Sequence, residues 1–306
     1  MAGITARKVT VQVPAKLNLC LDVVGEDGKG YHLLDGGMLA VDLYDTLTLC
    51  LEEGEGIEID CNRPGVPLDE SNLAARAARA FFQGSGAELS QKLRIHIKKQ
   101  IPAQAGMAGG SADAAAVLVG LNHLRGMGLT LPRLMELGLG IGSDVPFCLL
   151  GGCARAQGRG ERLETLPLPQ GVLVIAKPVG GTDTRGAFAL YDRRREQLRR
   201  PDVEAMVSAL RQQDGAGVGR AMANVFEQVC APDAVHALVK VMGEQGALGA
   251  SMTGTGTAVA SLFPDESAAQ RCLQLLKQKV LPLEYLGLHR PVEGGATMLE
   301  AAPPSP

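Results

Sequence analysis

The sequence lacks tryptophan, and aromatic residues of all kinds make up only 3% of its 306 residues. Its core must therefore come from Leu, Val, Ala, Ile and Met, which suit mixed layers of helix and sheet, and hydrophobic residues are 46% of the chain. No apolar run approaches the ~18 to 20 residues that a membrane span needs, and the N-terminal segment has no apolar signal-peptide core. We therefore expect a cytosolic protein without a membrane partner.

A strong charge of either sign is also missing. The formal net charge is −3, which gives no long-range field that would collect nucleic acid or an acidic membrane. The seven cysteines form neither C-x-x-C pairs nor a Cys/His ligand spacing. We predict that they are small buried hydrophobes in a reducing compartment. We also expect no nucleic-acid partner, and a monomer or weak homodimer.

The order of the elements predicts an α+β protein. Alternation of apolar and polar residues predicts strands at 8 to 24, 45 to 53, 93 to 101, 171 to 178 and 257 to 263, with a loop at 25 to 37. Helical periodicity predicts helices at 71 to 83, 131 to 140, 202 to 212, 217 to 230, 233 to 245 and 266 to 278. Pro146 favours an extended conformation for Val145. Strict β-α-β alternation is absent, which argues against a doubly wound parallel sheet.

The length of the chain fits two domains at roughly 100 to 200 residues each. A new series of predicted strands and helices begins after about residue 160. We therefore place the first lobe at residues 1–165 and the second at 166–300. The segment 301–306, "AAPPSP", is predicted to be a frayed tail.

The segment 101 to 124, "IPAQAGMAGGSADAAAVLVGLNHL", places glycines directly before an alanine-rich apolar helix. Glycine lets a ligand approach the backbone, and a helix start carries unpaired N–H groups and a partial positive charge. Gly106, Gly109, Gly110 and Ser111 would then point amides and one hydroxyl at a phosphate group. The alternative is a tight strand-to-helix turn in which glycine only permits packing. Asp113 is predicted in the first helical turn, where a carboxylate stabilises the helix dipole without further function.

Two familiar nucleotide-binding motifs are missing from the sequence. No G-x-x-x-x-G-K-[ST] occurs, because the one Gly-Lys pair, Gly28-Lys29, is followed by Gly30. No G-x-G-x-x-G closes a first β-α-β unit. These absences argue against a P-loop protein and against a dinucleotide-binding dehydrogenase.

Five segments, in their order and separations, resemble a known family, the GHMP small-molecule kinases. They are "VPAKLNLCLDVVG", "GYH", "IPAQAGMAGGSADAAA", "GSDVPFCLLGG" and "GASMTGTGTAVASLF", and the resemblance runs from about residue 8 to 292. It implies a two-lobed fold, with an N-terminal lobe like the second domain of ribosomal protein S5 and a ferredoxin-like C-terminal lobe. "PAKLNL", "DGxGYH" and "GSDVPF" resemble members of the non-mevalonate isoprenoid pathway. This implies transfer of the γ-phosphoryl group of ATP to the 2-hydroxyl of a diphosphocytidyl methylerythritol.

The resemblance also implies roles for individual residues, all in the cleft between the lobes. Asp144 in "GSDVPF" falls on the catalytic base of the family, and Lys16 in "PAKLNL" falls on its basic partner. A carboxylate near the alcohol can accept its proton, and an ammonium group offsets charge on the moving phosphoryl group. The positions of the substrate site are Asn18, Tyr31, His32 and Phe188. Those of the ATP site are Asn72, Pro102, Gly106, Met107, Ala108, Gly109, Gly110, Ser111, Ala112, Gly254, Thr255 and Gly256.

Each of these assignments has a structural alternative. An aromatic ring such as Tyr31 suits stacking on a pyrimidine, but it also suits a loop that covers a strand. Asp144 could be a turn or cap residue, and Lys16 could be a solvated residue at a strand edge. Asn72 could equally be the N-cap of a helix.

The phosphate loop departs from the pattern Gly-Leu-Gly-Gly-Gly-Ser-Ser of many family members. Ala108 replaces a glycine and Ala112 replaces the second serine, so Ser111 is the one hydroxyl left in the loop. We expect Mg²⁺ with ATP because it bridges phosphate oxygens, but its protein ligands are unassigned. Two other functions stay open. A homoserine- or mevalonate-type kinase has no need of Tyr31 and His32, and a ligand-sensing regulator has no need of a catalytic carboxylate and lysine.

Overall fold

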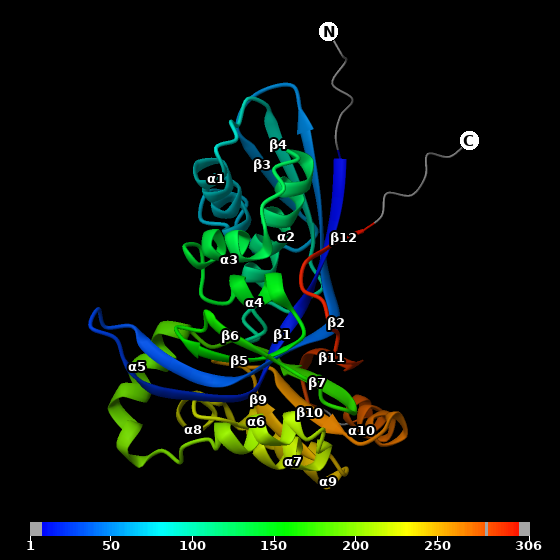
Figure 1. Ribbon diagram of the computed structural model, residues 1–306. Coiled ribbons are helices and arrows are strands. Elements are labelled where there is room, and N and C mark those ends of the chain that lie inside the picture. The colour runs from blue at the N-terminus through cyan, green and yellow to red at the C-terminus, as the bar shows by residue number, and fades with distance from the viewer. Residues whose placement is uncertain (1–7, 279–280, 300–306) are drawn as a thin grey trace.

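The computed structural model describes residues 8–278 and 281–299, so the tail predicted at 301–306 lies outside the described residues. Figure 1 shows two lobes, each built on a sheet. The first sheet contains β1 (Lys8–Glu26), β2 (His32–Glu52), β3 (Ile57–Cys61), β4 (Lys92–Lys98), β5 (Cys153–Gly158), β6 (Arg162–Leu166), β8 (Ala223–Asn224) and β12 (Thr297–Leu299). Its order is β12-β1-β2-β4-β3, with β5 beside β2, β6 beside β5, and β8 beside β1. The predicted α+β class is confirmed.

A long antiparallel hairpin of β1 and β2 forms the centre of the first sheet. The loop predicted at 25 to 37 is wrong, because β2 already begins at His32 and the turn is confined to residues 27–31. The glycines that signal a loop in the sequence instead let the two strands approach each other. A Cβ on Gly36 would lie 2.3 Å from the carbonyl oxygen of Cys20.

Four helices cover one face of the first sheet (Figure 1). They are α1 (Leu73–Ser85), α2 (Gly109–Leu124), α3 (Leu131–Leu139) and α4 (Val145–Leu150). Helix α2 packs on β1 and β2, and its buried alanines allow a close approach to the sheet. The extended conformation predicted for Val145 is wrong. Val145 is buried as the first residue of α4, and Pro146 lies in the first turn, where its missing N–H costs no helical hydrogen bond.

The second lobe has an antiparallel sheet of β7 (Val172–Pro178), β9 (Gly249–Met252), β10 (Val259–Phe263) and β11 (Leu283–His289). The strand order is β11-β7-β10-β9, and helices follow β7 and β10, as in a ferredoxin-like unit. The helices are α5 (Thr184–Arg194), the 3₁₀ turn η1 (Arg195–Gln197), α6 (Val203–Arg211), α7 (Gly215–Ala221), α8 (Glu227–Cys230), α9 (Asp233–Glu244) and α10 (Glu266–Gln278).

The single helix predicted at 217 to 230 is wrong, because β8 separates α7 from α8. Tertiary contacts at Asn224 explain the break. β8 pairs with β1, and Nδ2 of Asn224 donates hydrogen bonds of 2.7 Å to the carbonyl oxygens of Met252 and Gly254. Asn224 therefore fixes the start of the Gly-Thr-Gly segment that follows β9.

The two lobes are joined through the first sheet. β12, near the C-terminal end of the described residues, returns to pair with β1, and Met206 of α6 belongs to the same core as β1 and α2. The boundary between residues 165 and 166 stays a prediction. None of the described helices is long and apolar enough to cross a membrane.

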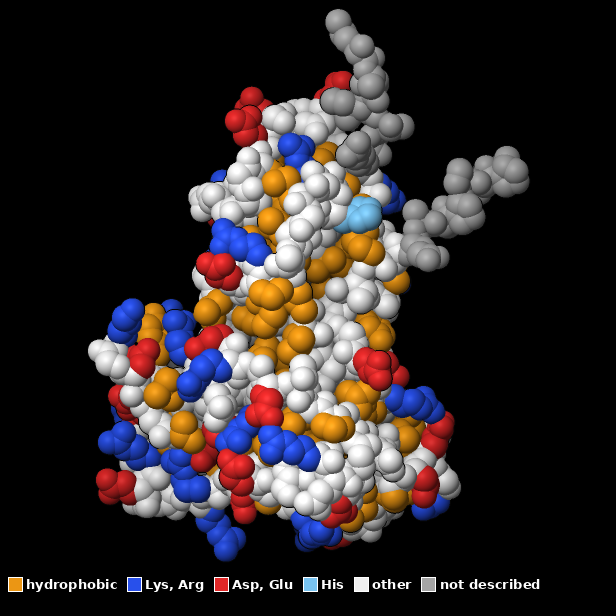
Figure 2. All heavy atoms as spheres, in the orientation of Figure 1, with side chains coloured by type: hydrophobic (Ala, Val, Ile, Leu, Met, Phe, Trp, Pro, Cys, Tyr) orange, Lys and Arg blue, Asp and Glu red, His pale blue; other side chains and the backbone are white. Residues whose placement is uncertain are grey.

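The surface agrees with the composition, whereas the prediction of buried cysteines is confirmed for four of the seven and is wrong for the partly buried Cys50, Cys61 and Cys230. On the face shown in Figure 2, basic and acidic side chains are interspersed over the second lobe. All seven cysteines are free, and four of them are buried. Burial raises the pKa of the Cys20 thiol to about 12, so this group stays protonated at neutral pH.

Candidate active site

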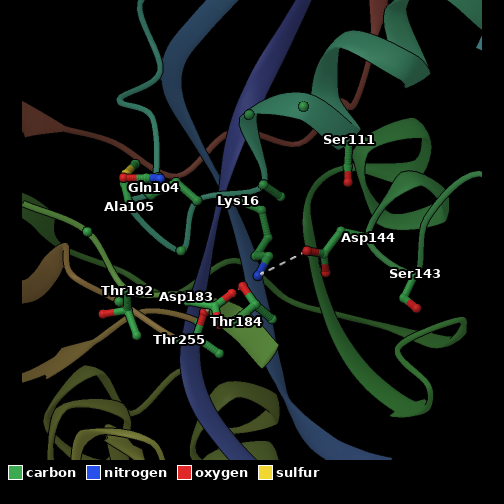
Figure 3. A pocket seen from close by; sticks show the side chains of 18 of the residues that line it. Lys16, Gln104, Ala105, Ser111, Ser143, Asp144, Thr182, Asp183, Thr184 and Thr255 are labelled. Carbon is green, nitrogen blue, oxygen red and sulfur yellow. Dashed lines mark hydrogen bonds and ion pairs between the residues drawn. The ribbon is translucent and has the colours of Figure 1, made fainter. Parts of the chain in front are cut away.

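The two lobes enclose a cleft of about 1480 Å³. Figure 3 shows Lys16, Ser111 and Asp144 of the first lobe facing Thr184 and Thr255 of the second. Seventeen of the predicted site residues line the cleft, namely Lys16, Asn18, Tyr31, His32, Asn72, Pro102, Gly106, Met107, Ala108, Gly109, Gly110, Ser111, Asp144, Phe188, Gly254, Thr255 and Gly256. Ala112 does not line it, because its side chain is fully buried in α2.

A buried lysine and a half-buried aspartate meet in the cleft. The distance between Lys16 Nζ and Asp144 Oδ2 is 3.6 Å, and their side chains are 5% and 33% exposed. Asp144 precedes α4, yet its side chain makes no capping hydrogen bond. Its carboxylate instead points toward Lys16, as Figure 3 shows. The arrangement leaves one carboxylate accessible to a ligand and balanced by one ammonium group.

Asn18 connects this pair to the Gly-Thr-Gly segment of the second lobe. Its Oδ1 accepts hydrogen bonds from Lys16 Nζ, at 2.9 Å, and from the backbone amide of Gly254, at 3.1 Å. The backbone amide of Asn18 donates to Thr253 Oγ1 at 2.9 Å. Asn18 therefore orients Lys16 and links the first lobe to the second by hydrogen bonds.

The two glycine-rich segments touch through their backbones. Gly106 and Gly254 both have positive φ angles, of 72° and 56°. A Cβ on Gly106 would lie 2.0 Å from the carbonyl oxygen of Thr253, and one on Gly254 would lie 2.8 Å from the carbonyl oxygen of Gly106. Only glycine fits at this contact, and both glycines line the cleft.

The start of α2 is open toward the cleft. Its N-cap residue, Ala108, has φ 58° and makes no side-chain capping hydrogen bond. The amides of Gly109, Gly110 and Ser111, the first residues of α2, lack the intrahelical partners that later residues have. In Figure 3 the hydroxyl of Ser111 points toward the cleft on the side of Asp144. Unpaired amides and a helix dipole at this point are suited to an anion.

A buried charge cluster lies beneath the phosphate loop, and its role is missing from the sequence prediction. Nζ of Lys99 lies 2.5 Å from Asp45 Oδ2 and 2.7 Å from Asp113 Oδ2, and it donates to the carbonyl oxygen of Gly109 at 3.1 Å. The prediction that Asp113 lies in the first turn is wrong. α2 begins at Gly109, so Asp113 is in the second turn, where it is buried against Lys99.

Asp113→Asn should flatten the pH dependence of stability. Burial, together with the nearby Asp45 carboxylate, raises the pKa of Asp113 to about 7 against the opposing effect of Lys99. Between about pH 4 and pH 7 the folded protein then keeps a proton that the unfolded chain releases, so the free energy of unfolding falls as pH rises. Each pKa unit corresponds to about 1.4 kcal/mol, which sets an upper limit of about 4 kcal/mol on the effect.

Urea unfolding of wild type and Asp113→Asn at a series of pH values from 4.5 to 7.5 measures this slope. Glu55→Gln, which removes an exposed carboxyl group on the loop after β2, is the matched control and should keep the wild-type slope. If Asp113→Asn also keeps the wild-type slope, the group with the raised pKa is not Asp113.

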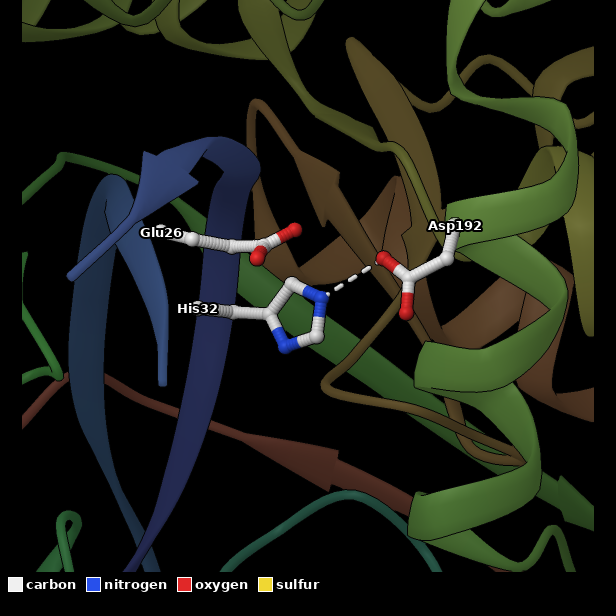
Figure 4. A group of neighbouring side chains, drawn as sticks. All are labelled: Glu26, His32 and Asp192. Carbon is white, nitrogen blue, oxygen red and sulfur yellow. Dashed lines mark hydrogen bonds and ion pairs between the residues drawn. The ribbon is translucent and has the colours of Figure 1, made fainter. Parts of the chain in front are cut away.

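The opposite end of the cleft carries aromatic and imidazole rings. The ring of Tyr31 is covered on one face by the guanidinium group of Arg159, at 4.0 Å from the ring centroid. The ring centroids of His32 and Phe188 lie 4.6 Å apart, and Nε2 of His32 lies 2.7 Å from Oδ1 of Asp192 (Figure 4). A flat heterocycle could stack here and find hydrogen-bonding groups at its edge.

Asn72 is the N-cap of α1, as its structural alternative predicts. Its Oδ1 accepts from the amide of Ala74 at 2.9 Å, and its Nδ2 donates to the carbonyl oxygen of Pro67 at 2.6 Å. Although Asn72 lines the cleft, both ends of its amide group are used within the protein. Its place in the ATP site stays a prediction.

Three charged residues that line the cleft and take part in the contacts described above are not predicted from the sequence: Lys99, Arg159 and Asp192. Lys99 directly follows the end of β4 and lies two residues before the glycine-rich segment 101 to 124, which is a weak local signal. Arg159 lies in a turn and Asp192 in a run of charged residues, where the sequence indicates only a solvated surface. Their positions in the cleft follow from the packing of β5 and α5 near the β1–β2 turn.

Comparison with known proteins finds matches in both parts of the chain. The family described as "GHMP kinases N terminal domain" matches residues 72–152, and "GHMP kinases C terminal" matches residues 206–281. A 4-diphosphocytidyl-2-C-methyl-D-erythritol kinase of Exiguobacterium sibiricum is 42% identical over 267 residues, covering 86% of this chain and 92% of the relative. One of Symbiobacterium thermophilum is 40% identical over 270 residues, covering 87% and 95%.

Solved structures agree in fold. A crystal structure of 4-(cytidine 5'-diphospho)-2C-methyl-D-erythritol kinase superposes with a TM-score of 0.73 at 30% identity, covering 95% of this chain and all of the other. Homoserine kinase from Cytophaga hutchinsonii has a TM-score of 0.76 at 20% identity, covering 98% and 99%. At that identity the second likeness concerns the fold alone.

Proposed function

The chain belongs to the 4-diphosphocytidyl-2-C-methyl-D-erythritol kinases of the GHMP kinase superfamily, and from this premise we propose how its cleft carries out the reaction. The protein is an ATP-using kinase of the non-mevalonate isoprenoid pathway, and its acceptor is a small-molecule alcohol. We infer that Asp144 is the general base and Lys16 its electrostatic partner. The observation that supports this most strongly is that their ion pair faces the same cleft as the open start of α2.

The proposed step is an in-line phosphoryl transfer. The oxygen of the substrate 2-hydroxyl attacks the γ-phosphorus of ATP while Asp144 accepts its proton, and the bond to the bridging oxygen of ADP breaks. Such a reaction depends mainly on positioning and on charge stabilisation. Lys16 Nζ, 3.6 Å from Asp144, offsets negative charge on the transferred group.

The start of α2 would hold the phosphates of ATP. The amides of Gly109, Gly110 and Ser111 supply donors, and Lys99 fixes the carbonyl of Gly109 from below. Mg²⁺ bound with ATP would neutralise phosphate charge, and Ser111 Oγ and the Asp144 carboxylate are oxygen donors of the kind it accepts. Among the described residues, the group of three potential metal ligands is instead Glu26, His32 and Asp192, at the far end of the cleft.

The ring-lined end of the cleft would hold the cytidine group. Tyr31 and Phe188 offer aromatic faces, and His32, whose ring lies against Phe188, offers an imidazole edge. The side chain of Tyr31 is 49% exposed although one face is covered by Arg159, so an aromatic surface is available to a ligand. We propose a monomer or weak homodimer as the working form.

Tyr31→Ala should weaken the cytidyl substrate far more than ATP. Base–aromatic stacking is worth about 1 to 3 kcal/mol, so KM for the cytidyl substrate should rise roughly 10- to 100-fold. KM for ATP should change less than about threefold, because ATP phosphates bind at the start of α2. Steady-state kinetics with each substrate varied in turn measures both. Tyr31→Phe keeps the ring and should behave like wild type, whereas equal losses for both substrates would make Tyr31 structural.

A substrate panel tests the assignment of the acceptor. With ATP and Mg²⁺ present, kcat/KM for the cytidyl diphosphate methylerythritol should exceed that for homoserine or mevalonate by at least about a thousandfold, because only the first can use the ring-lined end. Comparable turnover of homoserine or mevalonate would refute the proposed acceptor.

A further inference from the structure

A hydrogen bond between the two lobes orients the imidazole at the ring-lined end. His32 begins β2 in the first lobe, and Asp192 lies on α5 in the second. His32 Nε2 and Asp192 Oδ1 are 2.7 Å apart, and the two side chains are 17% and 44% exposed. Both residues line the cleft. The contact joins residues that are 160 positions apart in the sequence, so it exists only in the folded protein.

The carboxylate decides which imidazole nitrogen carries the proton. An ionised carboxylate can only accept hydrogen bonds, so Nε2 of His32 must be the donor in this contact. In a neutral imidazole the other nitrogen, Nδ1, is then an acceptor. Figure 4 shows Nδ1 on the side of the ring away from Asp192, and the described residues give it no hydrogen-bond partner.

The plane of the imidazole is fixed as well as its proton. The ring of Phe188, one helical turn before Asp192 on α5, lies against His32 with an interplanar angle of 34°. Phe188 is itself held by Phe226, at a centroid distance of 4.8 Å. The acceptor at Nδ1 is therefore presented in one orientation, by an aromatic contact and a carboxylate from the same helix.

We propose that Asp192 is a positioning residue for base selection, because it holds His32 as an acceptor toward the nucleobase. An acceptor at this position pairs with an exocyclic amino group, as on cytosine, and faces the lone pairs of the carbonyl oxygen that replaces it on uracil. The inference rests on the proposed function, since it assumes that the ring-lined end binds the base. It adds a residue that acts on substrate only through His32.

The neighbouring Glu26 does not change this assignment. Glu26, His32 and Asp192 place ligand atoms within 4.8 Å of one another, which is also the spacing of a metal site. However, Nε2 of His32 is already paired with Asp192, and Oε1 of Glu26 lies 3.4 Å from Nη1 of Arg195. Each group in the cluster therefore has a partner within the protein.

The test compares the cytidine substrate with its uridine analogue in wild type, Asp192→Ala and Asp192→Asn. Wild type should prefer the cytidine substrate in kcat/KM by at least about 100-fold, from one bond gained and one repulsion avoided. Asp192→Ala should lower this preference roughly 10-fold or more through KM, with KM for ATP unchanged. Asp192→Asn, whose amide can either accept from Nε2 or donate to it, should lower the preference less. Asp192→Asn keeps the size of the side chain and reports on the same contact if Asp192→Ala does not fold.

A second measurement separates positioning from a structural role. The chain has five histidines, so ¹⁵N-labelled imidazole signals can be resolved, and that of His32 assigned by its loss in His32→Gln. In wild type His32 should be the Nε2–H tautomer, and in Asp192→Ala it should become a mixture of tautomers. Glu196→Gln, four residues further on, exposed and outside the cleft lining, is the matched control and should keep the wild-type tautomer and base preference.

The outcomes distinguish this inference from the proposed function. If wild type turns over the cytidine substrate but Asp192→Ala keeps both the base preference and the tautomer, Asp192 is not a positioning residue. A wild type with no turnover of the cytidine substrate contradicts the proposed function instead. Restoration of the variants by added divalent metal would overturn the inference in favour of a metal site at Glu26, His32 and Asp192.

Discussion

Asp144→Asn should lower kcat by roughly 10² to 10⁴, which is the usual contribution of a positioned general base. The amide of asparagine is nearly the same size as the carboxylate but cannot accept the proton of the substrate hydroxyl. Folding should be unaffected, because the Asp144 side chain is 33% exposed and makes no capping hydrogen bond with α4. Steady-state turnover and thermal unfolding of the same preparation measure the two effects.

Glu136→Gln is the matched control for Asp144→Asn. Glu136→Gln makes the same carboxylate-to-amide change on the exposed side of α3, outside the cleft lining, and should leave kcat at the wild-type value. Should Asp144→Asn keep near wild-type turnover, Asp144 is not the base and positioning alone accounts for the reaction. A large fall in melting temperature would instead make Asp144 structural.

Gly106→Ala should damage both stability and ATP use. The new Cβ would meet the carbonyl oxygen of Thr253 at 2.0 Å, and Gly106 has φ 72°, which alanine rarely adopts. We expect a loss of roughly 1 to 3 kcal/mol in the free energy of unfolding. Because the two glycine-rich segments must then move apart, kcat/KM for ATP should fall about 100-fold, the scale of a 1 Å misplacement.

Gly126→Ala is the matched control for this prediction. Gly126 also has a positive φ, of 58°, but nothing lies within 4 Å of the Cβ that alanine would add. It should therefore show the backbone cost alone, with wild-type kinetics. If Gly106→Ala and Gly126→Ala lose stability equally and both keep full activity, the contact between the glycine-rich segments does not shape the ATP site.

Local patterns in the sequence predict the parts of the fold that local physics decides. α2 is predicted because an apolar, alanine-rich run follows a glycine-rich start, and the strand containing Lys16 is predicted from its alternation. The break at Asn224 is different in kind. Its cause is the pairing of β8 with β1 and the hydrogen bonds of Asn224 to the segment after β9. Both contacts involve residues far away in the sequence, so the local pattern around residue 224 does not predict them.

The same distinction applies to the site. That Lys16 and Asp144 form a pair follows from the resemblance to a kinase family, whereas their distance of 3.6 Å is known only from the fold. Asp113 illustrates how a local rule fails. Its expected position in the first helical turn is wrong because α2 begins four residues earlier, and burial then makes Lys99 its partner.

A crystal structure with a non-hydrolysable ATP analogue and the cytidyl substrate tests the central claim most directly. The claim predicts phosphates on the amides of Gly109, Gly110 and Ser111, and the substrate 2-hydroxyl between the γ-phosphorus and Asp144. The reacting oxygen should lie about 3 to 3.5 Å from phosphorus and within hydrogen-bond distance of the carboxylate. A terminal phosphate bound away from both Ser111 and Asp144 would contradict the account.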